Sequence, residues 1–242
     1  MEINWYPGQM ARAKAAIISK LKYIDLVIEV RDCRIPESSK NPELEQIISG
    51  KKHLLVLNKK DLAQENATRS WETYLHNLGL KTVSVSATKG FGFNKCLKII
   101  KSFSLSRSGL SGKKPFRAAV LGIPNVGKSS FINRLSRRSM ARTGNRPGVT
   151  RGEQWIKLPQ GIELLDTPGL LWPKLGDREA AVKLALTGAI KYELLDDYAL
   201  ALRLLQYLIS EDPAGLKSRF GEKISVFFED PKSLLQAIGT AR

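Results

Sequence analysis

Residues 122–130, with the sequence GIPNVGKSS, have the types and spacing needed to hold a chain of phosphates. The pattern G-x-x-x-x-G-K-S lies between the apolar run RAAVL and the helical start FINRL. Glycines allow such a loop to curl so that backbone N–H groups and the start of the following helix face an anion. Lys128 is then expected to contact the β- and γ-phosphates and assist catalysis, while the Ser129 hydroxyl binds Mg²⁺. We expect nucleotide contacts from Asn125, Val126, Gly127, Lys128, Ser129 and Ser130.

A second group of residues, with metal-binding chemistry, follows the apolar run IELL. Asp166 begins the tetrapeptide DTPG, and a carboxylate at a strand end can hold the coordination shell of Mg²⁺. The amide of Gly169 is expected to contact the γ-phosphate. Between the two loops, Thr150 in RPGVTR can bring a hydroxyl and a carbonyl to the metal and take part in catalysis. Taken alone DTPG could be an ordinary turn, but its position beyond a phosphate loop favours a metal site.

A third loop, after the apolar run HLLVL, consists of Asn58, Lys59, Lys60 and Asp61. A buried Asp61 carboxylate can accept hydrogen bonds from the N1–H and the exocyclic amine of guanine, and adenine lacks this pair of donors. Asn58 is expected to brace neighbouring loops, and the stem of Lys59 to cover the base. Ser86 and Ala87, which follow TVSV, would offer a backbone amide to the guanine carbonyl. The alternative, a merely charged turn, is disfavoured by the phosphate loop elsewhere in the chain.

These loops need a framework of strands that end at one edge of a sheet. Up to the DTPG loop, short apolar runs alternate with helical patterns, which is typical of an α/β fold with mostly parallel strands. The strand patterns near 154–157 and 162–165 are separated only by LPQG, so we expect an antiparallel pair there. The base-recognising loops precede the phosphate and metal loops, the reverse of their order in Ras-type GTPases. The sequence therefore predicts a circularly permuted P-loop GTPase domain with a six-stranded, mostly parallel sheet.

The remaining segments predict a linker and a second domain. Residues 102–115, SFSLSRSGLSGKKP, are rich in Ser, Gly and Lys and are expected to join the permuted halves. After Trp172-Pro173 the pattern is only helical, so we expect a GTPase domain over residues 1–175 and a small α-helical domain over 176–242 that contacts RNA. Because the segment after Gly169 leads into this second domain, we expect nucleotide state to be transmitted to it.

The composition of the chain limits the class of partner. Among 242 residues there are 39 Lys and Arg against 23 Asp and Glu, a net charge of +16. Such an excess indicates a polyanionic partner, nucleic acid or an anionic membrane, and a merely soluble basic protein is the alternative. No apolar run reaches the roughly 20 residues of a membrane span. The two cysteines fit neither a disulfide framework nor a metal spacing, which suits the reducing cytoplasm.

The motifs together resemble the ribosome biogenesis GTPase A family, one branch of the circularly permuted GTPases. They span nearly all of residues 4–175 and are WYPGQMARAK, VRDCRIP, NKKD, SATKG, GIPNVGKSS, RPGVTR and DTPGLLWP. The resemblance implies a cytoplasmic, ribosome-associated enzyme that hydrolyses GTP slowly with Mg²⁺. It also implies stimulation by the precursor of the large ribosomal subunit and contact with rRNA. We expect a monomer that binds neither DNA nor a membrane.

The resemblance also bears on catalysis. Leu170 stands where Ras-type enzymes hold a water-orienting glutamine, so another group must orient the water, a feature that the family shares. Relatives commonly carry histidine in an N-terminal PGH element where this chain has Gln9. We expect a rigid Pro7-Gly8 elbow to aim Gln9 at the γ-phosphate as a catalytic group; the alternative is a surface amide near RNA. Asn125 is expected to help hold potassium beside the phosphates, as in similar potassium-activated GTPases.

Further residues are candidates for RNA contact. Trp5 and Tyr6 could stack on bases, although core packing is the commoner fate of aromatic side chains. The sequence stops at Arg242, before the Gly-rich and basic terminal segments that family members often carry. Arginines between the phosphate and metal loops could clamp phosphates or form a solvated face, and these are Arg137, Arg138, Arg142, Arg146 and Arg151.

The preferred interpretation is a GTP-hydrolysing assembly factor that acts in maturation of the large ribosomal subunit and binds rRNA according to its nucleotide state. The alternative from another class is a nucleotide-gated binding factor for a different RNA, in which hydrolysis is incidental. A P-loop kinase for a small molecule is disfavoured, because NKKD recognises a base rather than an acceptor substrate.

Overall fold

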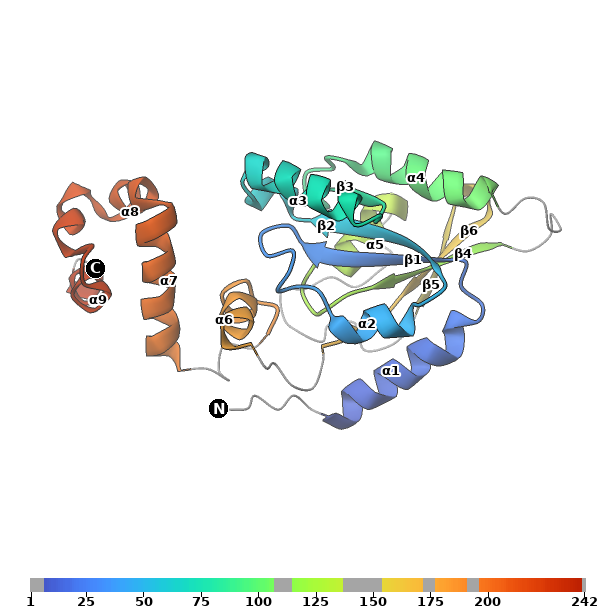
Figure 1. Cartoon of the computed structure of the whole chain (residues 1–242), viewed down its shortest axis with the longest axis horizontal. Coiled ribbons are helices and arrows are strands. Elements are labelled where there is room, and N and C mark those ends of the chain that lie inside the picture. Colours follow the sequence, from blue (N-terminus) through green and yellow to red (C-terminus); the bar gives the residue numbers. More distant parts are fainter. Residues whose placement is uncertain (1–6, 107–114, 137–153, 172–176, 191–195, 241–242) are drawn as a thin grey trace.

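A computed structural model describes residues 7–106, 115–136, 154–171, 177–190 and 196–240. Its centre is a six-stranded sheet with the order β3-β2-β1-β4-β6-β5 (Figure 1). All neighbouring strands are parallel except the pair β5 and β6, so the predicted fold and the predicted antiparallel pair are confirmed. The strands are β1 (Leu26–Asp32), β2 (Lys52–Asn58), β3 (Thr82–Ser84), β4 (Phe116–Leu121), β5 (Gln154–Leu158) and β6 (Ile162–Asp166).

Helices cover both faces of the sheet, which is why its inner strands are mostly apolar on both sides; in β1 the buried Glu29 and Arg31 form an ion pair. Every residue of β1 is buried. One face packs against α1 (Pro7–Leu21), α2 (Pro42–Ile47) and α3 (Glu65–Asn77). The opposite face packs against α4 (Phe93–Leu105) and α5 (Lys128–Ser136). Alternate residues of β2 face opposite sides of the sheet. Leu54 and Val56 are in the core with α4 and α5, whereas Leu55 and Leu57 pack with α3.

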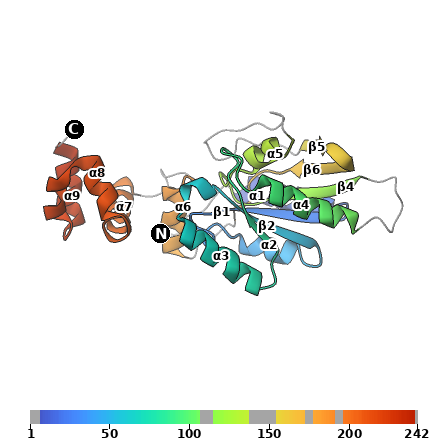
Figure 2. The same cartoon turned by 90° about the horizontal axis from the view of Figure 1, so that it is seen from above.

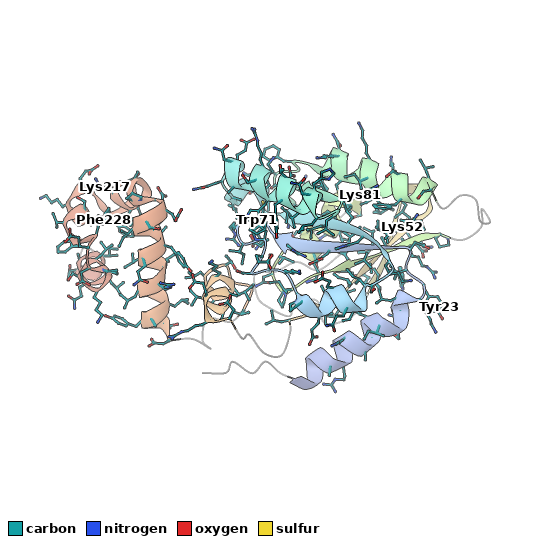
Figure 3. The ribbon with its side chains drawn as sticks, in the orientation of Figure 1. Tyr23, Lys52, Trp71, Lys81, Lys217 and Phe228 are labelled. Carbon is teal, nitrogen blue, oxygen red and sulfur yellow. The ribbon has the colours of Figure 1, made fainter. Side chains whose placement is uncertain are left out.

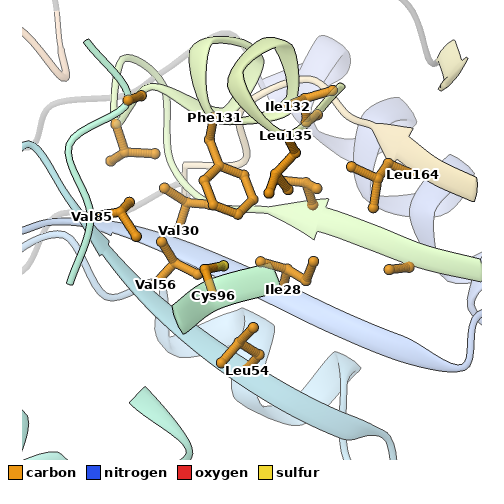
Figure 4. Close-up of a cluster of buried hydrophobic side chains, with 14 of the residues drawn as sticks. Ile28, Val30, Leu54, Val56, Val85, Cys96, Phe131, Ile132, Leu135 and Leu164 are labelled. Atoms are coloured by element: carbon orange, nitrogen blue, oxygen red, sulfur yellow. The ribbon is translucent and has the colours of Figure 1, made fainter. Parts of the chain in front are cut away.

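The packing around α5 anchors the helix that follows the phosphate loop. Figure 4 shows Phe131 directed at the sheet beside Val30 and Val56, with Cys96 of α4 nearby. Phe131 is fully buried, and its ring centroid lies 5.5 Å from that of Phe93. Close packing of this kind holds side chains in single rotamers, so the start of α5 is fixed relative to the strand ends.

The helices of the C-terminal part belong to two packing units. Leu184 and Ala185 of α6 (Arg178–Leu186), together with Ile190, are part of the same core as the sheet. A separate small core, which includes Leu205 and Leu234, is formed by α7 (Asp197–Glu211), α8 (Pro213–Phe220), η4 (Glu222–Phe227) and α9 (Pro231–Thr240). Figures 1 and 2 show this unit beyond α6, apart from the sheet. By packing, the division therefore falls after α6 rather than at the expected residue 175.

Two local predictions differ from the structure. Helix α1 begins at Pro7, so Pro7 and Gly8 form its first turn instead of an elbow. Proline suits this position because the first helical N–H has no intrahelical partner. Helix α4 continues to Leu105, so the linker predicted from residue 102 starts at least four residues later. The Ser-rich composition of that last turn concealed its helical spacing.

Among the helices that the structure describes, none combines the length and the apolar character of a membrane span.

Candidate nucleotide site

The loops predicted to bind a nucleotide lie at one edge of the sheet, because each follows a parallel strand. We call this the carboxyl edge, the usual ligand-binding edge of parallel α/β sheets. Residues 122–127 pass closely over the neighbouring strands: a Cβ at Gly122 would lie 2.3 Å from the Val30 carbonyl oxygen, and one at Gly127 would lie 2.4 Å from Asn58 Nδ2. Both glycines have positive φ, +147° and +91°. The predicted phosphate loop therefore needs glycine at these positions for space as well as for conformation.

Lys128 is buried at the start of α5. Its Nζ donates hydrogen bonds to the carbonyl oxygens of Ile123, at 2.8 Å, and Gly122, at 3.1 Å. Burial lowers the pKa of Lys128 to about 8, although the charge of Asp166 acts in the opposite direction. The loop thus holds an ammonium group in a site where its positive charge is poorly solvated, and an arriving phosphate would stabilise that charge.

Asp166 and Ser129 lie together, as the predicted magnesium site requires. Ser129 Oγ donates to Asp166 Oδ2 at 3.0 Å. Among the described residues, the buried Asp166 Oδ1 has no hydrogen-bond partner. Burial raises the pKa of Asp166 despite this hydrogen bond, the nearby Lys128 and the backbone amide of Thr167. A buried oxygen without a donor, beside a hydroxyl, is the arrangement that a hard cation completes, so the residues fit Mg²⁺.

The DTPG loop is fastened to the phosphate loop. Leu170 N donates to the Gly122 carbonyl oxygen at 3.1 Å, and a Cβ on Gly169 would lie 2.6 Å from Pro124 N. The Leu170 carbonyl accepts a hydrogen bond of 2.9 Å from Asn41 Nδ2, and the Leu170 side chain is buried against α1 and α2. Leu170 therefore has a packing role in place of a water-orienting one. Nothing in the sequence pattern had singled out Asn41.

Asn58 joins three loops that are distant in the chain. Its Nδ2 donates to the Val126 carbonyl of the phosphate loop at 2.8 Å, and its Oδ1 accepts from the Ala87 amide at 3.1 Å. Asn58 is 2% exposed, so both hydrogen bonds are shielded from water. The predicted bracing is present in the structure.

The base-recognising loop is held by a buried carboxylate that sequence reasoning missed. Asp32, at the end of β1, accepts from Lys59 Nζ at 2.9 Å and from Arg34 Nη2 at 2.7 Å. Burial alone would raise the pKa of Asp32, but the hydrogen bond from Arg34 and the charge of Lys59 outweigh it, so the pKa is lowered. Lys59 itself has a left-handed backbone, with φ of 64°. The motif VRDCRIP contained the signal, as an acid and a base two residues apart at a strand end.

Asp61 and the loop after β3 face each other at this edge. The Asp61 carboxylate is exposed and accepts a 3.3 Å hydrogen bond from Thr88 Oγ1. The Asp61 carboxylate is therefore not buried by the protein itself, and a bound base would have to cover it. The Ser86 amide donates to the Phe91 carbonyl and the Ala87 amide to Asn58, so an amide for the guanine carbonyl would have to be shared.

Arg134 of α5 supports the same loop, a contact that the sequence did not predict. Its Nε donates to the Ala87 carbonyl at 2.8 Å, and its Nη2 donates to the Thr88 carbonyl. The loop is thus attached both to the base-recognising loop and to the helix that begins at the phosphate loop. Lys60, between these groups, donates its backbone N–H to the Val85 carbonyl.

Two side chains of the site also contact the segment after α6. Asn125 Nδ2 donates to the Gly188 carbonyl at 2.6 Å, and Arg34 Nη2 donates to the Thr187 carbonyl at 3.4 Å. Asn125, predicted to hold potassium, has a left-handed backbone with φ of 58°. Two adjacent carbonyls at the end of α6 are therefore held by the phosphate loop and by the Asp32 cluster.

Several predicted site residues cannot be placed. Thr150, the arginines from Arg137 to Arg151, and Trp5 with Tyr6 lie outside the described residues. Gln9 lies in the first turn of α1, and its side chain is likewise outside the described part. Their roles in catalysis and RNA contact remain predictions.

Comparison with known proteins agrees with this geometry. Residues 117–209 match the protein family described as 50S ribosome-binding GTPase. The chain is 40% identical to ribosome biogenesis GTPase A of Bacillus pumilus, over 100% of this chain and 87% of that protein. It is 32% identical to the Thermotoga maritima protein of the same name, with coverages of 94% and 79%. The structure titled GNP-bound YlqF from T. maritima aligns with a TM-score of 0.62 at 26% identity, covering 94% of this chain and 95% of that one.

The fold, the reversed loop order and the site define a circularly permuted P-loop GTPase. With relatives of this identity and coverage, the chain belongs to the ribosome biogenesis GTPase A family. The predicted family is confirmed.

Replacing Asn58 with Ala should weaken GDP binding by at least about tenfold, because two buried polar groups lose their partner at a cost of about 1–3 kcal/mol each. Isothermal titration calorimetry measures the affinity, and thermal unfolding should show a lower Tm. Lys60→Ala is the matched control, since Lys60 uses only its backbone in the contacts above. Equal affinity in Asn58→Ala and Lys60→Ala would contradict the bridging role.

GDP affinity should fall by about tenfold between about pH 7 and about pH 9, because Lys128 in the free protein loses its proton above its pKa of about 8. Phosphate binds the charged form and raises its pKa, so affinity is lost as pH rises and is kept at lower pH. In Lys128→Arg the guanidinium does not titrate in this range, so affinity should be weaker but nearly constant. A flat profile in the unaltered protein would contradict the assignment.

Proposed function

We propose that this protein is a guanine-selective GTPase of low intrinsic rate that is stimulated by the precursor of the large ribosomal subunit and binds rRNA according to its nucleotide state. Membership of the family supports GTP binding and a role in ribosome assembly. One observation carries the proposal further: Asn58 ties the base-recognising loop to the phosphate loop, although 68 residues separate Asn58 from Val126. A single nucleotide can then contact both loops.

In this proposal, the described residues bind and orient the nucleotide. Lys128 would exchange its two carbonyl partners for β- and γ-phosphate oxygens. Ser129 and Asp166 would hold Mg²⁺, which supplies positive charge against the phosphate oxygens. The Gly169 amide would contact the γ-phosphate, and Asp61 would accept from guanine under the stem of Lys59. Because Asp32 fixes Lys59, the base would meet a preformed surface.

The group that orients the attacking water is a separate question. Leu170 is 4% exposed and contributes a side chain without a polar atom, so it cannot perform this role. Gln9, Thr150 and a potassium ion beside Asn125 remain our proposals for the missing catalytic function. A slow reaction in the isolated protein follows if one of these groups is positioned only when the particle binds.

Helix α6 supplies a route from nucleotide to RNA-binding unit. At its C-terminal end, the carbonyls of Thr187 and Gly188 accept from Arg34 and Asn125. At its N-terminal end, Glu179 accepts a 2.7 Å hydrogen bond from Arg203 of α7. A change in the phosphate loop could therefore move α6 and, through Glu179, the unit of α7–α9. This two-ended attachment supports the proposal of nucleotide-dependent RNA binding.

The central test measures GTP turnover with and without immature large-subunit particles, in potassium and in sodium buffers. We expect slow hydrolysis alone and an increase of at least about tenfold with particles. The specificity control is Asp61→Asn, which should lose GTP and gain xanthosine triphosphate, because an amide can donate to the C2 carbonyl that replaces the guanine amine. Turnover that particles leave unchanged would favour the nucleotide-gated factor, and tight binding of ATP would exclude guanine selectivity.

Hydrogen exchange of α7–α9 should differ between the GDP state and a GTP-analogue state, and Glu179→Gln should reduce that difference. The neutral amide keeps the shape but weakens the charge-assisted hydrogen bond to Arg203. Glu211→Gln, at the exposed end of α7, is the matched control. Identical protection of α7–α9 in both nucleotide states would rule out transmission through α6.

A further inference from the structure

The opposite edge of the sheet carries a second concentration of charge. Strands β1, β2 and β3 begin there, and α1 and α4 end there, so we call it the amino edge. Its segments are residues 19–24, 49–53, 79–82 and 98–106, and none of them contains Asp or Glu. Their lysines are Lys20, Lys22, Lys51, Lys52, Lys81, Lys98 and Lys101.

The centre of the amino edge is an aromatic ring with two cations beside it. Lys81 Nζ lies 4.6 Å and Lys52 Nζ 5.9 Å from the ring centroid of Phe103. Lys52 Nζ also donates to Ser106 Oγ at 2.8 Å. Both lysines are exposed, and neither is within ion-pair distance of a described carboxylate. A ring can stabilise a cation by about 0.5–1 kcal/mol at an exposed site, but it supplies no negative charge to neutralise the two lysines.

An exposed aromatic side chain extends the same surface. Tyr23 is 55% exposed, and Lys22 Nζ lies 5.0 Å from its ring centroid. Lys51 Nζ donates to the Ile24 carbonyl at 3.2 Å, which connects this segment to the start of β2. Figure 3 shows Tyr23, Lys52 and Lys81 at the end of the sheet away from α7–α9.

Two acids in the same part of the sheet, Asp25 and Glu163, are already engaged. Asp25 Oδ2 accepts from the Arg117 amide at 2.9 Å, and Glu163 pairs with the Arg117 guanidinium at 3.0 Å. Lysine stems covering Phe103 would by themselves be ordinary surface packing. Lys52 and Lys81, without an ion-pair partner among the described residues, and an exposed tyrosine together complement a polyanion that also offers flat bases.

We propose that the amino edge is an RNA-binding surface, distinct from the nucleotide site and from α7–α9, in which Lys52 and Lys81 contact phosphates and Tyr23 stacks on a base. The inference rests on the proposed function for the identity of its partner. With this surface, RNA is held at the end of the sheet opposite to the nucleotide. The GTPase domain then has its own attachment to the particle while the carboxyl edge stays accessible to nucleotide.

Fluorescence anisotropy with a labelled oligouridylate of about 20 nucleotides, over about 50 to 200 mM salt, tests the proposal. In Lys52→Ala/Lys81→Ala the slope of log affinity against log salt should become shallower by about 1.4, or about 0.7 for each lost contact. Arg69→Ala/Lys95→Ala removes two exposed charges near the carboxyl edge and should keep the original slope. GDP affinity should be unchanged in the amino-edge variant, which shows that it is folded.

Tyr23→Ala provides an independent readout, because stacking carries no counterion term. Its affinity should fall by roughly tenfold with an unchanged salt slope, and Tyr23→Phe should restore the affinity. Equal slopes for the amino-edge pair and the unaltered protein would overturn this surface alone. Failure of the unaltered protein to bind RNA would overturn both this surface and the RNA-binding part of the proposed function. Lysine-dependent binding to phosphatidylserine vesicles but not to RNA would assign the surface to a membrane and overturn the proposal.

Discussion

The site depends on the two hydrogen bonds made by the Asn58 side chain. One reaches the Val126 carbonyl and the other the Ala87 amide, so a single buried amide sets the spacing between phosphate loop and base loops. Circular permutation places these loops on opposite sides of the 102–115 segment in the chain. Permutation changes loop connections but not sheet neighbours, and β1 still lies between β2 and β4. The amide therefore finds both partners whichever end of the domain comes first.

Two charged groups of the described site are buried where water solvates them poorly, at the positions where a phosphate or a metal ion would stabilise them. Lys128 is charged in a poorly solvating pocket, and Asp166 has a buried oxygen with no donor among the described residues. Groups in this condition gain more from phosphate and Mg²⁺ than they would at the surface, since the desolvation has already occurred on folding. The packing around Phe131, which fixes α5, and around Leu170, which fixes the DTPG loop, stabilises the fold and offsets this desolvation.

The charged side chains are arranged differently at the two edges of the sheet. At the carboxyl edge, Lys59 and Arg34 have a specific partner in Asp32. At the amino edge, lysines gather around Phe103 without acids in the same segments. Paired charges give fixed geometry for a small ligand, whereas cations such as Lys52 and Lys81, with no described carboxylate in ion-pair distance, suit a long anion of variable shape. Helix α6 connects the first of these edges to the helical unit.

The sequence by itself determined the fold class and the loop order, and it predicted the chemistry of the nucleotide site. Glycine spacing, apolar runs and NKKD are local patterns, so they can be recognised in the sequence without knowledge of distant contacts. Tertiary structure decided what depends on neighbours in space. Asn41 belongs to no motif and Asp32 lies in VRDCRIP without an assigned role, and their roles exist only because β1 ends beside Lys59 and α2 begins beside Leu170. The boundary of the helical unit was decided in the same way, since α6 has the helical pattern of α7 but buries its apolar side against the sheet.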